Sequence, residues 1–152
     1  MTPAPASPAR QGLGRSVSAV AVGGLVGTGI RLAIDAVLPH AGADFPWATL
    51  LINVSGALAL GWLVGGIWKR PHVPSWLRAG LGAGVLGSYT TFSAMVVSVI
   101  DMGASDAGAG AAAYLAASLV VGFAAAALGL AVGSRQAHRR MPHSIDDAGR
   151  TL

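Results

Sequence analysis

The run GVLGSYTTFS, residues 84–93, decides the fold of this chain. It is polar and rich in glycine, yet it lies inside an apolar segment that extends from Ala79 to Ile100. That length is close to the ~20 residues that a membrane-spanning helix needs. A helix interrupted in hydrocarbon is tolerated only where its free backbone groups face protein, an ion or a water-filled cavity. The run therefore predicts an ion or ligand site near the middle of a membrane.

Composition places the rest of the chain in the same class. Of 152 residues, 53% are hydrophobic and 11% are charged, and the mean hydropathy is +0.62. Soluble domains carry about 25% charged residues, so this chain is far too poor in charge for a soluble domain. We expect an all-α membrane protein with four transmembrane helices, the third broken near the midplane. The expected spans are residues 17–38, 46–68, 79–100 and 111–133.

Three regions follow from this pattern. Residues 17–134 are expected to form the four-helix membrane domain. Residues 1–16 are rich in Pro, Ala, Ser and Arg and are predicted to be a disordered N-terminal segment. Residues 135–152 are predicted to be a basic, mobile tail. The sequence contains no cysteine, which excludes disulfides and thiolate metal sites.

Positive charge gathers at one end of the predicted bundle. Every lysine and arginine except Arg31 precedes the first span, lies between the second and third, or follows the fourth. The positive-inside rule then places both termini and the middle loop in the cytoplasm. Such basic loops also touch anionic membrane lipid. Nucleic-acid binding is not supported, because the chain lacks interleaved aromatic residues or a suitable fold. The opposite ends carry Asp35, Asp44, Asp101 and Asp106.

Small residues in the first two spans have a simple structural interpretation. Gly23 and Gly27 form a small-xxx-small pair that lets a partner backbone approach closely. Gly56 and Gly61 in the second span are expected to serve the same purpose.

Polar residues inside the spans each allow two interpretations. Arg31 either pairs with Asp35, one turn along, or lines an aqueous vestibule that attracts anions. Asn53 either makes an interhelical hydrogen bond or donates its amide to a passing anion. Tyr114 and Ser118 lie four residues apart on one helix face and form one side of a polar track, unless the serine bonds its own backbone.

Three motifs, found in order along the chain, resemble those of the CrcB/Fluc family of bacterial fluoride channels. The resemblance covers about three quarters of the chain and all four predicted helices. The motifs are Gly23-Gly24-x-x-Gly27-x-x-x-Arg31, Phe45-Pro46-Trp47-x-Thr49-Leu50-x-x-Asn53-x-x-Gly56 and Gly84-x-x-Gly87-x-x-Thr90-Thr91-Phe92-Ser93.

This resemblance implies a channel and no enzyme, in the plasma membrane of a bacterium. It implies an antiparallel dimer with two fluoride pores and a central structural Na⁺ held by the backbone carbonyls of Gly87 and Thr90. Phe92 is expected to offer its electropositive ring edge to fluoride, and Arg31 to lie at a vestibule. The other pore residues implied are Asn53, Ser118, Tyr114, Thr91 and Ser93.

One departure from the family pattern changes the expected assembly. Met95 stands where a second aromatic is usual, and Met has no ring edge to present. An antiparallel homodimer also requires one sequence to insert both ways, whereas this chain is strongly biased to one side. We therefore expect one half of a heterodimer, paired with an oppositely oriented paralogue.

Two other functional classes are alternatives to the channel subunit. A non-conducting assembly subunit of such a heterodimer is the main alternative. A small multidrug-type transporter is disfavoured, because the proton-coupled examples rely on a membrane-embedded glutamate and this chain has none.

Overall fold

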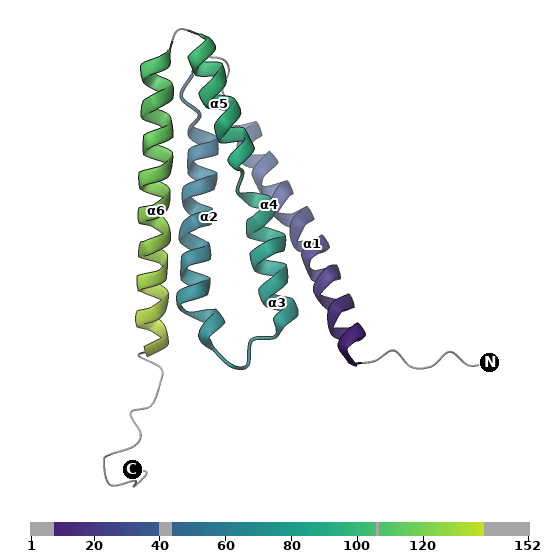
Figure 1. Ribbon diagram of the computed structural model, residues 1–152. Helices are drawn as coiled ribbons and strands as arrows, with labels where there is room; N and C mark the ends of the chain where they lie inside the picture. Colours follow the sequence, from purple (N-terminus) through teal and green to yellow (C-terminus); the bar gives the residue numbers. More distant parts are fainter. Residues whose placement is uncertain (1–7, 40–43, 106, 139–152) are drawn as a thin grey trace, which may run out of the picture.

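The computed structural model describes residues 8–39, 44–105 and 107–138, and these residues form helices and connections without a strand. Four helical segments are long and apolar enough to cross a membrane: Gly12–Val37, Trp47–Lys69, Ser75–Ala104 and Gly108–His138. This confirms the four predicted spans (Figure 1). The elements are α1 (Pro8–Val37), α2 (Trp47–Gly65), η1 (Ile67–Lys69), α3 (Ser75–Ala79), the π-helix η2 (Gly80–Leu86), α4 (Gly87–Tyr89), α5 (Phe92–Ala104) and α6 (Gly108–His138).

The first and last helices are longer than the sequence predicted. α1 begins at Pro8, so residues 8–16 of the segment predicted to be disordered are helical. Pro8 at the first helical position favours a helix that starts there. α6 continues to His138, beyond the predicted end at residue 133. The predicted end marks only where the apolar stretch stops. A helix can continue beyond the membrane into polar residues when no Pro or Gly ends it. The remaining terminal residues, 1–7 and 139–152, lie outside the described residues.

α2 packs along α6, and glycines on both helices form the contact. A Cβ on Gly61 would collide with the backbone of Ala126, and one on Gly129 would collide with the backbone of Leu58. Gly133 faces Trp62 in the same way. Lipid tails are as apolar as the helices, so association in a membrane depends on such close backbone approach.

α1 packs in the same manner on the first half of the third span. A Cβ on Gly23 would collide with the Gly80 carbonyl, and one on Gly27 with the Val85 carbonyl. From the other side, a Cβ on Gly84 would come within 2.9 Å of the Val20 carbonyl oxygen. The packing roles predicted for these α1 glycines are confirmed.

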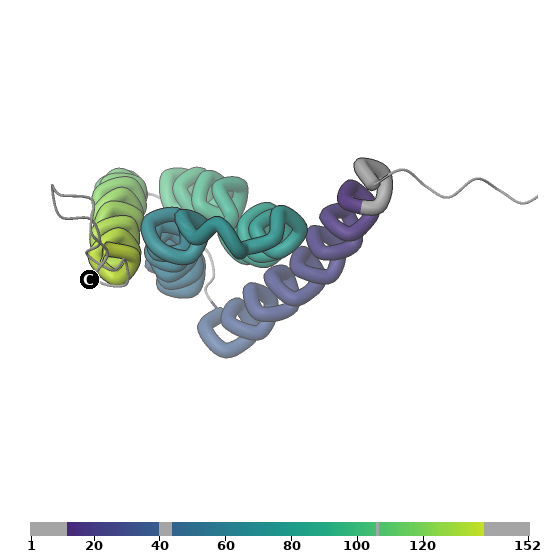
Figure 2. Tube along the Cα trace, turned by 90° about the horizontal axis from the view of Figure 1, so that it is seen from below, coloured from purple at the N-terminus to yellow at the C-terminus, as the bar shows by residue number. Residues whose placement is uncertain are grey.

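The third span changes its packing partner part-way along. Its first half (α3, η2 and α4) lies on α1, whereas α5 lies on α6. α1 and α6 are on opposite sides of the molecule (Figure 2). Between α4 and α5 the backbone is extended at Thr90 (φ −75°, ψ 153°) and at Thr91 (φ −147°, ψ 120°). These two residues redirect the span from one partner to the other.

The glycine packing on α1 gives a matched pair of substitutions. Gly27→Ala is expected to destabilise the fold by about 1–3 kcal/mol, because the added methyl meets the backbone of Val85 rather than a movable side chain. Gly29 has nothing within 4 Å of an added Cβ, so Gly29→Ala is expected to change stability by no more than about 0.5 kcal/mol. Thermal unfolding in detergent measures both. Equal unfolding temperatures for the two variants would contradict this packing.

Candidate functional site

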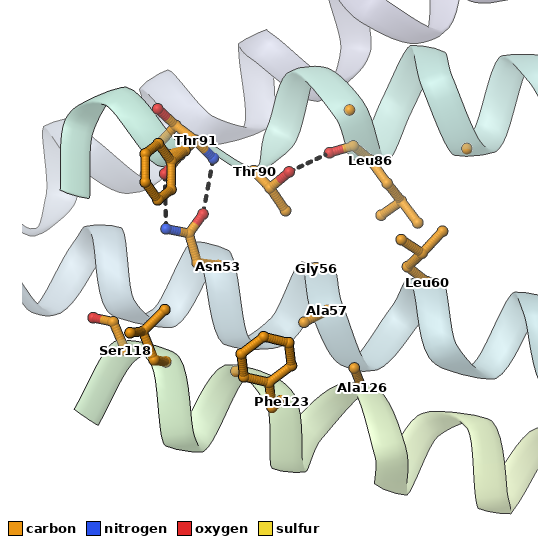
Figure 3. A pocket seen from close by; sticks show the side chains of 15 residues that line it. Asn53, Gly56, Ala57, Leu60, Leu86, Thr90, Thr91, Ser118, Phe123 and Ala126 are labelled. Atoms are coloured by element: carbon orange, nitrogen blue, oxygen red, sulfur yellow. Dashed lines mark hydrogen bonds between the residues drawn. The ribbon is translucent and has the colours of Figure 1, made fainter. Parts of the chain in front are cut away.

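Asn53 on α2 ties that helix to the extended residues of the third span. Its Nδ2 donates to the Thr91 carbonyl oxygen at 2.8 Å, and the Thr91 backbone N–H donates to its Oδ1 at 2.8 Å (Figure 3). The interhelical role considered for this amide is therefore present. One of the two N–H bonds of Nδ2 is used, and the second has no protein acceptor in the described part of the chain.

The two threonines satisfy part of the interrupted backbone themselves. The Thr90 N–H and Oγ1 both donate to the Leu86 carbonyl, at 3.0 and 2.9 Å. Thr91 Oγ1 accepts from the Ala94 N–H at 3.2 Å and so caps the start of α5. Gly56 on α2 lies directly against the Thr90 methyl group, which leaves no room for a larger residue there.

At this interruption, the helical donors of two backbone carbonyls are diverted to side chains. In a continuous α-helix, the Gly87 carbonyl would accept from the Thr91 N–H, and the Thr90 carbonyl from the Ala94 N–H. Both donors go instead to side-chain oxygens of Asn53 and Thr91. Over the described residues, no backbone N–H outside the regular helices donates to either carbonyl. Carbonyl oxygens are ligands that suit a hard cation.

Side-chain metal ligands are not gathered anywhere in the described part of the chain. No group of three or more His, Asp or Glu residues there could hold a metal ion. The carbonyls of Gly87 and Thr90 are oxygen donors whose helical N–H partners are diverted to side chains.

A pocket of about 420 Å³ lies beside the interruption, between α2, the third span and α6. Its walls are mostly small or apolar residues, and no charged residue lines it. Two phenylalanines, Phe92 and Phe123, contribute rings to its lining. Phe123 was not singled out from the sequence, because a lone aromatic on an apolar helix gives no signal of its own. The polar lining residues are Asn53, Thr90, Thr91 and Ser118.

A second polar group is buried next to this pocket, where α2, α5 and α6 meet. The Tyr114 hydroxyl is surrounded by the side chains of Ser118, Thr49 and Ser98. All four residues are at least nine-tenths buried. By distance and angle, neither the Tyr114 nor the Ser118 hydroxyl completes a hydrogen bond with a described residue, although all three neighbouring hydroxyls lie close enough to the Tyr114 hydroxyl to interact with it. We call these four residues the hydroxyl cluster.

The hydroxyl cluster differs from the other hydroxyls of the spans. Ser55 and Ser134 donate to carbonyls three or four residues earlier in their own helices. Ser118 makes no such bond within the described chain, so the self-bonded interpretation of this serine is wrong. Thr49 and Ser98 were missed as site residues, although Thr49 lies four residues before Asn53 and thus on the same helix face.

The remaining predicted residues are placed as follows. Tyr114 is fixed by an edge-on contact with Phe45, whose ring centroid is 5.3 Å away. Met95 is 4% exposed and belongs to the core around Tyr114 rather than to the pocket lining.

Ser93 is exposed, and its Oγ lies 3.2 Å from Thr91 Oγ1. Arg31 is half-buried on α1 and forms no ion pair with Asp35 in the described part of the chain.

Comparison with known proteins identifies the family. The model of the family described as "CrcB-like protein, Camphor Resistance (CrcB)" matches residues 18–130. The chain belongs to the CrcB family. The matched residues include every residue that lines the pocket and all four members of the hydroxyl cluster.

Relatives within the CrcB family match most of the chain and most of their own length. The chain is 42% identical over 113 residues to a "Fluoride-specific ion channel FluC" of Azotobacter vinelandii, covering 74% of this chain and 91% of the relative. It is 37% identical over 114 residues to a "Fluoride-specific ion channel FluC 2" of Geobacillus kaustophilus, covering 74% and 88%. It is 36% identical over 119 residues to the FluC protein of Agrobacterium fabrum, covering 78% and 95%. With its four spans, this CrcB protein is a multi-pass membrane protein.

The hydroxyl cluster predicts an unusual stability effect. Tyr114→Phe removes a buried hydroxyl without a hydrogen-bond partner and keeps the ring against Phe45. Because an unpaired buried polar group is unfavourable, the free energy of unfolding is expected to stay unchanged or to rise by up to about 1 kcal/mol. Thermal unfolding measures it, with Tyr89→Phe as the matched control. The Tyr89 hydroxyl lies 2.8 Å from Ser55 Oγ, and its removal is expected to lower stability. A large loss of stability in Tyr114→Phe would contradict this description.

Proposed function

We propose that this CrcB protein is a subunit of a fluoride-selective channel that lets F⁻ leave the cytoplasm passively. It is a channel component and not an enzyme. The observation that carries the proposal is the match, over the whole site, to relatives that are named fluoride-specific ion channels. The pocket and the hydroxyl cluster provide the chemistry that such an ion requires.

A small, strongly hydrated anion needs hydrogen-bond donors wherever it sheds water. The pocket offers the second N–H of Asn53, and the adjoining cluster offers the hydroxyl groups of Tyr114 and Ser118, which complete no hydrogen bond with a described residue. In hydrocarbon such unpaired donors are unfavourable unless an ion or water uses them. Their presence in an otherwise apolar bundle supports an anion pathway along α2 and α6.

The edges of aromatic rings are also electropositive, although they attract an anion more weakly than N–H and O–H donors do. A phenyl ring is negative on its face and positive at its edge. Phe92, at the start of α5, is 73% exposed, so its ring is free to meet an ion or another subunit. Phe123 lines the same pocket from α6.

The absence of a full positive charge in the pocket lining also suits conduction. A channel must hold its ion strongly enough to admit it and weakly enough to release it. Neutral amide, hydroxyl and ring-edge donors satisfy both conditions better than a lysine or arginine would. Arg31 lies on α1, outside the pocket lining, and is proposed to attract anions at a vestibule.

We assign a structural Na⁺ to the free carbonyls of Gly87 and Thr90. The support is the loss of their helical donors at the interruption. Such an ion would supply positive charge that neutralises the carbonyl dipoles in the membrane interior. With the interruption near the bilayer midplane, it would satisfy groups that water cannot reach.

The charge distribution supports a fixed orientation in the bacterial plasma membrane. The start of α1, the η1–α3 connection and the end of α6 lie at one end of the bundle (Figure 1). The basic residues Arg15, Lys69, Arg70, Arg78 and Arg135 belong to these segments. This end is therefore proposed to face the cytoplasm, together with both termini.

We propose an antiparallel dimer whose second subunit is an oppositely oriented paralogue. One strongly biased sequence does not insert readily in both directions. Met95 has no ring and is buried in the subunit core, so a partner subunit would provide the aromatic groups that this chain lacks. This chain would in turn contribute the exposed ring of Phe92 to the pores of the dimer.

Fluoride efflux from liposomes tests the channel and its assembly. The purified chain co-expressed with its paralogue is expected to release fluoride and to retain chloride, because only the heterodimer has complete pores. The chain alone is expected to release fluoride slowly or not at all. A conducting, mixed-orientation dimer of the single chain would contradict the heterodimer. Failure to release fluoride in either preparation would favour a non-conducting subunit.

Two serines of α6 test the pathway within the channel. Ser118→Ala is expected to slow fluoride efflux at least about tenfold, since a donor without a protein partner is lost from the pathway. Ser134→Ala is the control, because that hydroxyl donates to the Ala131 carbonyl of its own helix. Its efflux should equal that of the parent. Equal rates for both variants would remove Ser118 from the pathway.

A further inference from the structure

We infer that Asn53 and Thr91 are positioning residues for the bound cation, which they serve by keeping two backbone carbonyls open. The inference rests on the Na⁺ assigned to Gly87 and Thr90 under the proposed function. Neither side chain is proposed as a ligand. Each one accepts a backbone N–H that would bond a carbonyl in a continuous helix. The two residues thereby determine which carbonyl oxygens stay available to the cation.

Asn53 acts on the Gly87 carbonyl from a neighbouring helix. Its Oδ1 accepts the Thr91 N–H at 2.8 Å, and this N–H is the helical donor for Gly87. Its Nδ2 simultaneously holds the Thr91 carbonyl at 2.8 Å. Two bonds fix the peptide groups on both sides of Thr91, so this residue cannot return to helical geometry while the amide is in place.

Thr91 acts on the Thr90 carbonyl from within the chain. Its Oγ1 accepts the Ala94 N–H at 3.2 Å, and this N–H would be the helical donor for Thr90. The role of Thr91 as the N-cap of α5 therefore has a second consequence, because it leaves the preceding carbonyl free. Thr91 is 9% exposed, so water does not compete readily for this bond.

The neighbouring contacts make these two effects independent of Thr90 itself. Thr90 Oγ1 donates back to the Leu86 carbonyl and does not reach toward the free carbonyls. Gly56 lies against the Thr90 methyl group and fixes its position from α2. Thus Asn53 and Thr91, rather than Thr90, supply the acceptors for the N–H groups that would bond the Gly87 and Thr90 carbonyls in a continuous helix. This separates a positioning role from general packing.

The acceptor function can be isolated by paired substitutions. Asn53→Leu removes both polar atoms at similar volume, whereas Asn53→Asp keeps an oxygen that accepts the Thr91 N–H. Thr91→Val removes the Oγ1 acceptor and keeps the β-branched shape, whereas Thr91→Ser keeps the acceptor. Ser55→Ala is the control, because Ser55 contacts Tyr89 of α4 but none of the diverted donors.

The measurement is the unfolding temperature of the full chain, in complex with its paralogue if the chain needs it to fold. The Na⁺ concentration is raised in steps, and N-methylglucamine replaces Na⁺ so that the ionic strength stays constant. The parent and Ser55→Ala are expected to gain stability with Na⁺ at the same half-saturating concentration. Asn53→Leu and Thr91→Val are expected to need at least about tenfold more Na⁺, as is usual when groups that orient metal ligands are lost. Asn53→Asp and Thr91→Ser are expected to stay within about threefold of the parent.

The outcomes separate this inference from the proposals on which it rests. A parent without any Na⁺ dependence would overturn the cation site and this inference together, while fluoride efflux would still test the channel. A normal Na⁺ dependence in Asn53→Leu and Thr91→Val would overturn only the positioning role. If Asn53→Leu does not fold, the Thr91→Val and Thr91→Ser pair decides. Equal Na⁺ dependence of that pair would then contradict the inference.

Discussion

Hydrocarbon supplies no hydrogen-bond partner for a free peptide group, and this constraint governs the third span. Two extended residues, Thr90 and Thr91, interrupt the helical bonding there. Two of the released N–H groups find side-chain acceptors: the Thr91 N–H donates to Asn53, and the Ala94 N–H donates to Thr91 Oγ1. Asn53 also donates to the Thr91 carbonyl. The Gly87 and Thr90 carbonyls would accept these two N–H groups in a continuous helix, and we propose that a cation lies beside them instead.

The glycine contacts explain how the chain accommodates this interruption. α1 approaches η2 through Gly23 and Gly27, and α2 approaches α6 through Gly61 and Gly129. Two tightly packed pairs are thereby formed, and the third span passes from the first to the second between α4 and α5. The pocket lies between α2, α6 and the part of the span around the interruption, and the hydroxyl cluster lies where α5 meets α2 and α6.

The membrane class, the four spans and the packing glycines could be predicted from the sequence, because hydropathy and small-residue spacing act locally. The ends of α1 and α6 could not, since a polar helix outside the membrane has no hydropathy signal. For Asn53 the sequence left two interpretations. Only the three-dimensional arrangement shows that its side-chain amide forms a hydrogen bond with the backbone of Thr91. Thr49 and Ser98 are ordinary residues in their own helices and become notable only where Tyr114 brings three helices together.

The most direct test of this account is a high-resolution experimental structure of the channel in a lipid bilayer, with Na⁺ and fluoride present. The account predicts cation density bounded by the Gly87 and Thr90 carbonyls, with the Thr91 N–H donated to Asn53. It also predicts anion density along α2 and α6, between the pocket and the hydroxyl cluster. A third span in which the Thr91 N–H returns to the Gly87 carbonyl, with no ion beside it, would contradict the account.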